Sequence, residues 1–522
     1  MITKSKRTLL IPLTSILLVA VAATFAACPS FRAETGEEAA VPAAAPRVPG
    51  PDAWWTGQAE AAERSGQPDA AHEFRARAIA YASSLQAQKA AAGPGSSLAS
   101  ALPPLAEAAL YVQTPRGAAP KLAKHEPASG VYLGMLGADK RVGYDFSKIE
   151  GVYEKKHAMY LAYVGWRKFQ TDTSTYFPKR TSDRVKELGG ALQIGWEPRY
   201  GLDDVKDDEY VRTFAREAKA SGIPIFLRYA SEMNGNWVPW YGDPQKYIEK
   251  FRLIHDIMKE EAPNVAMVWS PNYAPANNID EYYPGDAYVD WVGFSLYATP
   301  LTGGEEDLEH TVIEYFAPLY AKYSHKPIMI AEGAVGHTVL KTNQSYHAWG
   351  EGQLGYMYGF LPRMFPMVKA MTYFNFGRAQ AQRSNMEYVY DLGESALMDG
   401  FYKRLTRSDL FLDGVEQGVN AAPQQYVPLS GSHLPAGKQR IMMYARMKDV
   451  STPFAVALYQ GERRLGISYE MPWEIDVDIP AADAAKPWRI VAFNKQMEPI
   501  AATPGTAVVR AASPDKSNSG SP

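Results

Sequence analysis

The sequence has 522 residues, which is too long for one ordinary domain and predicts roughly two to four. Its hydrophobic content of 46% and charged content of 21% are typical of a globular protein and exclude a largely disordered chain. The net charge of −3 gives no basic footprint for nucleic acid, and a single cysteine excludes a disulfide framework or a cysteine-rich metal site.

The chain begins with a processing signal. Three basic residues precede the apolar run "LLIPLTSILLVAVAATFAAC", which ends at Cys28. The segment resembles a bacterial lipoprotein signal, although Phe25 stands where that pattern usually has Leu. The resemblance implies a signal peptide over 1–28, lipidation of Cys28, and an exported lipoprotein of the bacterial cell envelope that meets the membrane through its lipid. The alternatives are an ordinary secretory signal with an incidental cysteine and, third, a retained transmembrane anchor.

Two segments of different composition follow. Residues 29–51 are rich in Ala, Pro and Glu, which predicts a flexible linker. Residues 52–126 are predicted to be helical, and "AWWTGQAEAAERSGQPDAAHEFRARAIAYA" indicates two helices joined by a Gly-Gln-Pro turn. A single hairpin cannot bury its own apolar face, so we expect it to pack on a neighbouring domain. The alternative is that the hairpin binds a protein partner.

Residues 127–405 contain eight short apolar runs separated mostly by amphipathic stretches. The runs start near residues 130, 159, 191, 223, 265, 289, 326 and 368. One of the clearest helices begins at Asp243-Pro244 and repeats apolar residues at helical spacing up to Met258. Eight alternations of a doubly buried strand with a helix predict an α/β fold of the (β/α)8 TIM-barrel type. An open doubly wound sheet is the runner-up, without a glycine-rich phosphate fingerprint to support it.

The last part of the chain is predicted to be all β. Residues 406–510 contain alternating runs such as "FAVALYQGERRLG" and "WEIDVDIP", which predict a C-terminal β-sandwich. This region resembles the immunoglobulin-like modules attached to bacterial extracellular enzymes. We expect it to pack against the barrel or act as a spacer, with carbohydrate binding as the alternative. Residues 511–522 are predicted to be a disordered tail.

Two glutamates stand at the ends of predicted barrel strands. Glu232 ends the fourth run and Glu332 ends the seventh. Catalytic groups of a TIM barrel lie at the C-terminal ends of its strands. Two carboxyl groups at one mouth suggest work on a glycosidic bond, with a separation of about 5–5.5 Å for retention or about 6.5–9.5 Å for inversion. Trp237 and Trp240 follow Glu232 and are predicted to offer ring faces to sugars.

Other carboxylates compete for these roles. Glu197 ends the third run and is the strongest rival, although we interpret it as a structural or hydrogen-bonding residue. Asp139 follows the first run, and Asp286 lies before the sixth. Asp290 begins the sixth run, so we expect it to point to the wrong end of the barrel.

The motifs "LRYASEMNGNW", "YYPGDAYVDWVGFSLY" and "PIMIAEG" resemble glycoside hydrolase family 26, a retaining family, over about residues 127–400. The resemblance implies Glu232 as acid/base and Glu332 as nucleophile. It also implies that Tyr297 hydrogen-bonds the nucleophile and that Arg228 is the arginine of the fourth-strand motif.

This sequence departs from the β-mannanases of that family in two places. Ser231 stands where they have His, and Tyr373 is the nearest aromatic residue where they commonly have Trp. Both changes alter the floor of the sugar site without removing a catalytic carboxylate. Asn234 and Asn375 are further candidate partners of sugar hydroxyls.

The predicted function is therefore a retaining glycoside hydrolase that cleaves β-linked polysaccharide, with β-1,4-mannan as one candidate substrate. The partner is a polysaccharide or oligosaccharide and not a nucleic acid. Hydrolysis of this kind needs no metal or nucleotide, so no cofactor is expected. The alternative is a non-catalytic or assembly-linked lipoprotein that binds an exopolysaccharide at the cell surface.

Overall fold

The computed structural model describes most of the chain from residue 51 to residue 503. The described residues are 51–64, 68, 71–72, 74–79, 102–117, 121–167, 169–172, 174–415, 424–429, 434–448, 452–484 and 486–503. The predicted signal peptide with Cys28, almost all of the predicted linker, and the predicted tail at 511–522 lie outside them.

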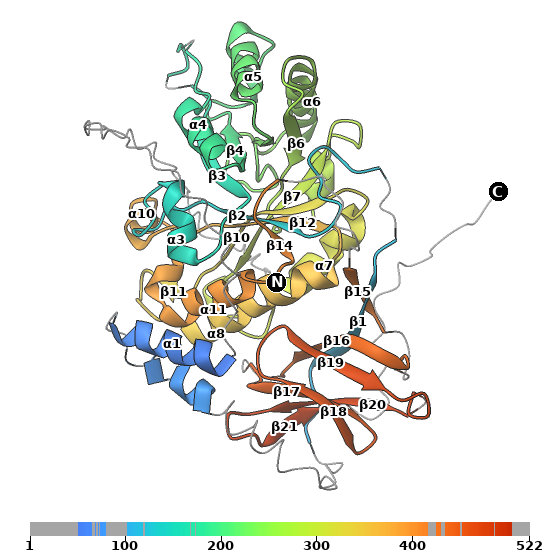
Figure 1. The fold of residues 1–522 in the computed structure, drawn as a ribbon. Helices are drawn as coiled ribbons and strands as arrows, with labels where there is room; N and C mark the ends of the chain where they lie inside the picture. Colours follow the sequence, from blue (N-terminus) through green and yellow to red (C-terminus); the bar gives the residue numbers. More distant parts are fainter. Residues whose placement is uncertain are drawn as a thin grey trace, which may run out of the picture.

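Eight parallel strands form a closed barrel at the centre of the molecule (Figure 1). In ring order they are β2 (Val131–Met135), β3 (Met159–Gly165), β4 (Ala191–Glu197), β5 (Ile225–Tyr229), β6 (Val265–Trp269), β7 (Trp291–Ala298), β10 (Ile328–Val335) and β12 (Val368–Tyr373). The ring closes because β12 pairs with β2, with Ala370 opposite Tyr132. The predicted TIM barrel is confirmed, all eight apolar runs form its strands, and the open-sheet alternative is excluded.

Helices surround the barrel. The longer ones are α4 (Lys179–Glu187), α5 (Glu209–Ser221), α6 (Pro244–Glu261), α7 (Val312–Tyr323), α8 (His347–Leu354) and α11 (Ala396–Thr406). Shorter ones are α3 (Ile149–Tyr153), α9 (Leu361–Met364) and α10 (Arg378–Arg383), and a π-helical turn at Gly355–Phe360 joins α8 to α9. Single 3-10 turns occur at Phe146–Lys148, Leu202–Asp204, Ile279–Tyr282 and Leu392–Glu394.

Helix α6 shows how local sequence sets these elements. The Asp243 carboxylate accepts a hydrogen bond from the backbone N–H of Lys246 at 3.0 Å, and Pro244 occupies the first turn. The buried face includes Tyr247, Phe251, Ile254 and Met258, which recur at helical spacing. The start and the buried face of this helix confirm the prediction.

The barrel interior is a packed core rather than a pore. Its apolar cluster includes Tyr132, Phe226 and Trp291, all fully buried. Polar groups inside are paired, since Gln193 donates to the carbonyl of Ala331 at 2.7 Å and accepts from Thr372 at 2.7 Å. The interior is therefore filled by side chains, as is usual for this fold.

The barrel extends slightly beyond its predicted end at residue 405. Strand β14 (Phe411–Leu412) pairs in parallel with β2, outside the ring of eight. Leu412 and Val415 pack against the interior cluster at the end of the barrel where β2 begins. Short pairs of strands decorate the loops: β8 (Leu301–Thr302) with β9 (Glu305–Glu306), and β11 (Thr338–Val339) with β13 (Tyr388–Val389).

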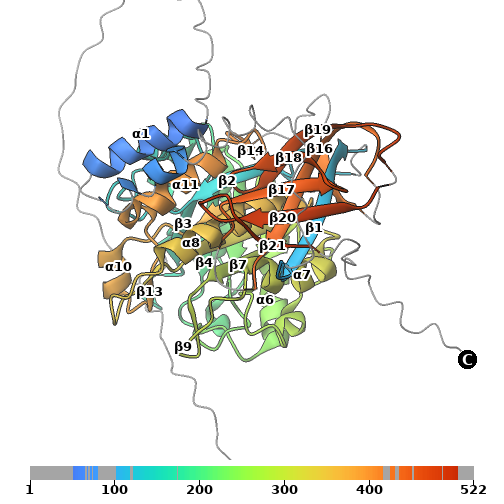
Figure 2. The ribbon, with the colours of Figure 1, turned by 90° about the horizontal axis from the view of Figure 1, so that it is seen from below.

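Two four-stranded antiparallel sheets pack on one side of the barrel (Figure 2). One has the order β15 (Gln424–Pro428), β1 (Glu107–Pro115), β16 (Gly437–Arg446), β19 (Trp473–Ile479). The other has the order β18 (Arg463–Ser468), β17 (Ala455–Gln460), β20 (Trp488–Phe493), β21 (Pro499–Ala502). The C-terminal sheets are thus present, and their immunoglobulin-like relationship stays a prediction.

Strand β1 corrects the prediction that residues 52–126 are helical. It precedes the barrel in sequence but lies between β15 and β16, with Tyr111 opposite both Pro428 and Met442. Its alanines and glutamate favour a helix by propensity, but pairing on both edges overrides that preference. The sandwich is therefore built from both sides of the barrel sequence and does not begin at residue 406.

The sandwich is packed tightly onto the helices after β10. The Phe360 ring centroid lies 5.3 Å from that of Tyr444 and 5.5 Å from that of Trp473. The Arg363 Nε donates to Glu474 at 2.7 Å across the same boundary. The expectation that the sandwich packs against the barrel is confirmed by these contacts.

The N-terminal helices pack on the barrel, as predicted. Trp55 of α1 (Pro51–Arg64) and Phe74 are buried against Ala396 and Leu397 of α11. Arg77 forms a two-pronged ion pair with Glu351, at 2.7 and 2.6 Å. No helix in the described part of the chain has the length and apolar character needed to cross a bilayer.

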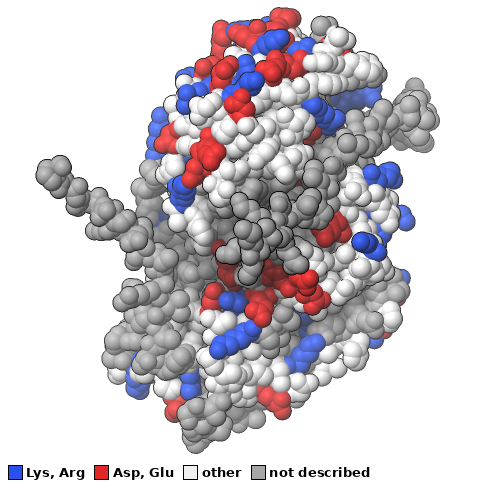
Figure 3. All heavy atoms as spheres, turned by 180° about the vertical axis from the view of Figure 1, so that it is seen from behind, with Lys and Arg blue, Asp and Glu red and all other residues white. Residues whose placement is uncertain are grey.

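Surface charge is mixed in sign. Figure 3 shows acidic and basic side chains interspersed at the end of the molecule formed by α5 and α6. There Arg212 pairs with Asp207 at 2.7 Å and with Glu261 at 3.1 Å.

Candidate active site

Both predicted catalytic glutamates lie at the mouth of the barrel. Glu332 belongs to β10, where the register with β7 shifts between Ile330 and Glu332. Glu232 lies three residues beyond the end of β5, in a turn where its φ is +59° and that of Ala230 is +47°. Non-glycine residues adopt this left-handed region rarely, and such strain concentrates at functional sites.

Glu332 is held by one hydrogen bond and one ion pair. The Tyr297 hydroxyl donates to Oε2 at 2.8 Å, and Nη1 of Arg228 lies 2.6 Å from Oε1. Arg228 is fully buried, and its Nε donates to Ser270 at 3.0 Å. Burial lowers the pKa of Arg228, but the charge of Glu332, its hydrogen bonding and the neighbouring Tyr163 and Glu232 together outweigh burial, so the pKa rises and the guanidinium stays charged. A fixed positive charge and a phenol donor suit Glu332 to act as a carboxylate.

Glu232 has a different environment. Trp237 Nε1 donates to Oε2 at 2.8 Å, and Asn272 Nδ2 donates to Oε1 at 2.9 Å. Burial raises the pKa of Glu232, and the charge of Glu332 raises it further, although these donors act in the opposite direction. A raised pKa keeps a carboxylic acid protonated and ready to donate.

Asn234 supports this turn from behind. Its Nδ2 donates to the carbonyls of Asn272 and Pro275, each at 2.9 Å, and its Oδ1 accepts from the backbone N–H of Asn272. The side chain is fully buried. The prediction that Asn234 contacts a sugar is therefore wrong, because its hydrogen-bonding groups are used to position the segment that carries Asn272.

The two tryptophans after Glu232 differ. Trp237 is half-buried and reaches Glu232. Trp240 is 4% exposed, and its Nε1 donates to the carbonyl of Ser231 at 2.8 Å. The prediction that Trp240 offers a face to substrate is wrong, since the indole is packed in the core beneath the turn.

Tyr373 and Asn375 are also fully buried, which contradicts their predicted contact with substrate. The Tyr373 hydroxyl donates to the carbonyl of Tyr390 at 3.2 Å. Asn375 donates to Asp139 at 2.6 Å and accepts from the backbone N–H of Leu392 at 3.0 Å. Sequence position placed both residues at the end of β12, but the loop ending at Leu392 covers them.

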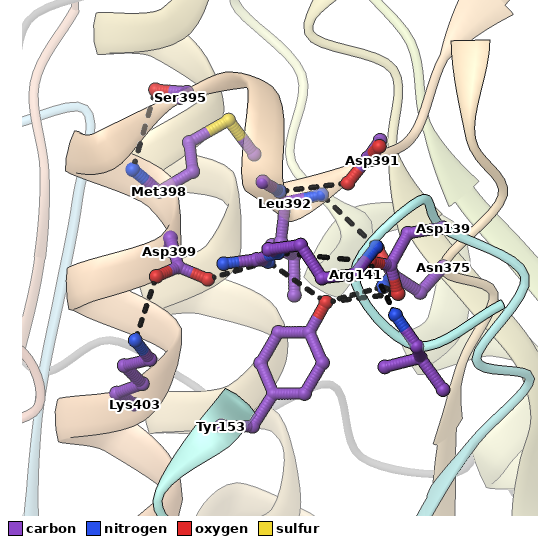
Figure 4. A network of polar contacts seen from close by, with 12 residues as sticks. Asp139, Arg141, Tyr153, Asn375, Asp391, Leu392, Ser395, Met398, Asp399 and Lys403 are labelled. Atoms are coloured by element: carbon purple, nitrogen blue, oxygen red, sulfur yellow. Dashed lines mark hydrogen bonds and ion pairs between the residues drawn. The ribbon is translucent and has the colours of Figure 1, made fainter. Parts of the chain in front are cut away.

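Figure 4 shows the network that includes Asn375 and Asp139. Arg141 lies between Asp139 and Asp399, with its Nη2 2.8 Å from Asp399. Asp399 also pairs with Lys403 at 2.9 Å. Asp139 is thus a structural carboxylate that joins the loop after β2 to the end of β12, and is not a rival catalyst.

Glu197 is a third carboxyl group at the mouth. It ends β4, the third strand of the ring, and therefore lies across from β10, the seventh. Arg199 donates to its Oε2 at 3.0 and 3.2 Å. Burial raises the pKa of Glu197 to about 7, with the charge of Arg199 opposing and that of Glu332 adding to the rise. It is buried and hydrogen-bonded, as the sequence interpretation expected.

The remaining acidic rivals lie at the opposite end of the barrel. Asp290 accepts from the backbone N–H of Met267 at 2.8 Å just before β7 begins, which confirms its predicted orientation. Asp286, four residues earlier, accepts from Tyr283 at 2.6 Å. No group of three or more His, Cys, Asp or Glu side chains in the described ranges is arranged to hold a metal ion.

Two residues of the site escaped the sequence analysis. Asn272 follows β6 and bonds Glu232 directly, and its position after a buried strand was the available signal. Tyr163 of β3 has a buried hydroxyl, and burial, with the charge of Glu332 next, raises its pKa well above the ordinary value. No pattern marks Tyr163, because β3 is apolar throughout.

Comparison with known proteins places the glutamates within a family match. Residues 205–356 match the model of glycosyl hydrolase family 26, and this range includes Glu232 and Glu332. The chain is 31% identical over 222 residues to Endoglucanase H of Acetivibrio thermocellus, covering 39% of this chain and 24% of that protein. It is 28% identical over 222 residues to Beta-1,3-xylanase TXYA of a Vibrio species, covering 40% of this chain and 45% of that protein. It is 30% identical over 95 residues to a Mannan endo-1,4-beta-mannosidase of Bacillus subtilis, covering 16% of this chain and 25% of that protein.

Similar folds occur among solved structures. A Cellulomonas fimi endo-beta-1,4-mannanase double mutant has a TM-score of 0.39 and 14% identity, covering 70% of this chain and 91% of that chain. A GH26 beta-mannanase from Bacteroides ovatus has a TM-score of 0.37 and 15% identity, covering 54% of this chain and 90% of that chain. The chain spans less than half the length of the three curated relatives named above. What these comparisons establish for this chain is a glycosyl hydrolase family 26 match over the segment that carries both mouth glutamates.

Proposed function

We propose that this protein is a retaining glycoside hydrolase that cleaves β-linked polysaccharide by a two-glutamate double displacement. The observation that carries the proposal is that the two carboxyl groups have different neighbours. Glu332 faces a buried guanidinium and a phenol, whereas the pKa of Glu232 is raised. A carboxyl group with a raised pKa suits the acid, and a carboxyl group paired with a buried cation suits the nucleophile.

In the first step the Glu332 carboxylate attacks the anomeric carbon, forming a glycosyl ester while the glycosidic bond breaks. The proton of Glu232 passes to the departing glycosidic oxygen, and Glu232 becomes a carboxylate. In the second step Glu232 takes a proton from water, whose oxygen attacks the anomeric carbon and releases Glu332. Two inversions retain the configuration of the sugar. Tyr297 and Arg228 hold the nucleophile in line throughout.

We propose the class of substrate, a β-linked polysaccharide, and not a particular sugar. The relatives are named for glucan, β-1,3-xylan and β-1,4-mannan activities, so they agree on β-linked polysaccharide and differ on the monomer. Of the two positions that depart from the β-mannanase pattern, Tyr373 is fully buried and is not a substrate contact here, whereas Ser231 lies directly before Glu232. We retain β-1,4-mannan as one member of the panel to be tested.

The test uses Glu232→Ala and Glu332→Ala on barley mixed-linkage glucan, carob galactomannan and β-1,3-xylan. Loss of the general acid should lower kcat by about 10²- to 10⁴-fold, and loss of the nucleophile should lower it at least as much. Azide added to Glu232→Ala should yield a β-glycosyl azide, and added to Glu332→Ala an α-glycosyl azide. Wild-type activity in either variant would refute the proposal. A wild type that binds but hydrolyses none of the polymers would favour the non-catalytic carbohydrate-binding alternative.

We also propose that the protein is an exported lipoprotein anchored through Cys28, on the strength of the basic start, apolar run and lone cysteine of the sequence. Cells fed labelled palmitate should label the wild type and not Cys28→Ser. The variant should move from the membrane to the soluble fraction. A labelled Cys28→Ser protein, or an unlabelled wild type, would refute the anchor without bearing on catalysis.

A further inference from the structure

Exposed aromatic rings gather on one side of the barrel mouth. Six large hydrophobic side chains are exposed among the described residues, and four of them are aromatic. These four are Tyr144 (53% exposed), Phe169 (61%), Tyr200 (39%) and Tyr241 (45%). The other two, Ile79 and Val427, are aliphatic and lie in the N-terminal helices and the sandwich.

Each aromatic belongs to a different loop of the catalytic face. Tyr144 follows β2, Phe169 follows β3, Tyr200 follows β4 and Tyr241 follows β5. These four strands are consecutive neighbours in the ring. The loops after strands of a TIM barrel lie on its C-terminal face, so the rings follow one half of the rim. Among the described residues, the loops after β6, β7, β10 and β12 carry no comparably exposed ring.

The fold does not require these rings. The barrel and its helices bury other aromatic residues, such as Trp196 against Phe214 at 3.9 Å between ring centroids. Single exposed hydrophobic residues are ordinary, but here every exposed large aromatic of the described chain is on one half of one rim. A flat ring with an apolar face suits the apolar faces of sugar rings, and tyrosine adds a hydroxyl for their polar edges.

Two of the four loops also carry residues of the candidate active site. Tyr241 lies on the same loop as Glu232, and Tyr200 follows Arg199, which pairs with Glu197. Trp237, half-buried on the β5 loop, connects the row to the acid/base through its hydrogen bond to Glu232. The loops that carry exposed rings are therefore the same loops that surround the two glutamates.

We propose that Tyr144, Phe169, Tyr200 and Tyr241 form a platform that binds a β-linked glycan chain beyond the sugars being cleaved. The identity of the ligand rests on the proposed function. Rings on four successive loops provide contacts for sugars farther along a polymer than those that flank the cleaved bond. We name the four residues the aromatic platform.

The test replaces all four platform residues by Ala in the full-length chain. Ile79→Ala with Val427→Ala is the matched control, since it removes exposed hydrophobic side chains away from the mouth. Exposed substitutions should change stability little, which thermal unfolding checks. KM is measured on whichever of barley mixed-linkage glucan, carob galactomannan and β-1,3-xylan the wild type hydrolyses fastest. A chromogenic aryl β-disaccharide of the same linkage serves as the short substrate.

The platform variant should raise KM for the polymer about tenfold, equivalent to about 1.4 kcal/mol of binding, and leave kcat/KM for the short substrate unchanged. The control should match the wild type on both. Unchanged polymer KM, or an equal loss on both substrates, would overturn the platform while the proposed hydrolase stands.

A binding measurement separates this inference from catalysis. Affinity electrophoresis of the Glu232→Gln protein in gels containing each polymer should show retardation, which the platform substitutions should abolish. If the wild type hydrolyses nothing but the platform still governs retardation, the hydrolase fails and the platform survives. If no polymer retards the protein, or retardation persists without the four rings, the platform is refuted.

Discussion

At the scale of single residues, the mouth gives two chemically identical side chains different environments. Glu332 receives Arg228 and Tyr297, a fixed positive charge and a neutral donor. Glu232 receives two neutral donors, Trp237 and Asn272, and its pKa is raised by burial and by the charge of Glu332. The asymmetry comes from which strands supply the partners. Strand β5 carries Arg228, which reaches Glu332 on β10 three strands away in the ring, and β7 carries Tyr297, while β6 leads into Asn272.

Asn272 should adjust the pKa of Glu232 rather than bind the glycan. Its N–H bond favours the ionised form of Glu232, so Asn272→Ala should raise the pKa of Glu232 further. The alkaline limb of kcat/KM, which reports the protonated acid, should move to higher pH, and kcat should fall about 10- to 100-fold through misplacement. Asn277→Ala, an exposed neighbour on the same loop, is the control. An alkaline limb that stays in place would show that the bond does not govern this titration.

Glu197 should make stability depend on pH. Its pKa rises from an ordinary 4.5 to about 7 on folding, so the folded state binds more protons between these values. Stability therefore falls as pH rises through that window, by about 3 kcal/mol at most. Glu197→Gln keeps the acceptor for Arg199 and removes the titration, so the variant should gain on the wild type between pH 4.5 and 7.

Urea unfolding at both pH values measures the Glu197 effect, with Glu187→Gln on the exposed end of α4 as the control. The wild type and Glu197→Gln share every other titrating group, including Asp391, whose pKa burial raises to about 6. Their difference therefore isolates Glu197. A constant difference between wild type and Glu197→Gln across the window would refute the shift.

At the scale of elements, a glycine in β4 leaves room for a tyrosine ring of the neighbouring strand β3. A Cβ on Gly195 would lie 2.7 Å from Cδ1 of Tyr163, so the Tyr163 ring rests directly on the glycine. Glycine inside a strand commonly marks such a close approach. The contact matters for the site because the charge of Glu332 acts on the Tyr163 hydroxyl. Packing between two strands thus sets the position of a group beside the nucleophile.

Gly195→Ala should therefore cost about 1–3 kcal/mol of stability and reduce activity, because the rigid Tyr163 ring must shift away from the added methyl group. Gly151→Ala is the matched control, since a Cβ there meets nothing within 4 Å in helix α3 and alanine favours a helix by up to about 1 kcal/mol. Chemical denaturation and kcat on the best polymer provide the two measurements. Equal stability of the two variants would mean that β4 tolerates the added methyl group.

The elements differ in how far sequence could predict them. The barrel strands are continuous apolar runs, and helix α6 carries its own cap and periodicity, so both follow from local chemistry. Glu232 and Glu332 followed from position at strand ends. Tyr373 and Asn375 share that kind of position, yet the loop ending at Leu392 buries them, and no local pattern reveals such a cover. The prediction for the residues of β1 was wrong for a similar reason, since the strands that pair with β1 are more than 300 residues away.

At the scale of the whole molecule, the sandwich and barrel share one core. A continuous apolar cluster includes Leu110 of β1, Phe360 beside the barrel and Trp473 of β19. Because β1 precedes the barrel in sequence while β16 follows it, the sandwich holds both ends of the barrel segment together. Packed boundaries of this kind distinguish the sandwich from a module attached by a linker.

Leu110→Ala tests this shared core. Leu110 is 1% exposed, and its truncation should cost about 2–5 kcal/mol, whereas Gln113→Ala in the same strand should stay within about 0.5 kcal/mol of the wild type. If barrel and sandwich unfold together, calorimetry should show one transition that shifts to lower temperature, and heat inactivation should shift with it. A separate sandwich transition that shifts alone, with the inactivation temperature unchanged, would show that the barrel is stable without its partner. The shared cluster predicts the first result, because loss of β1 packing removes support from Phe360 and Trp473 on both sides of the boundary.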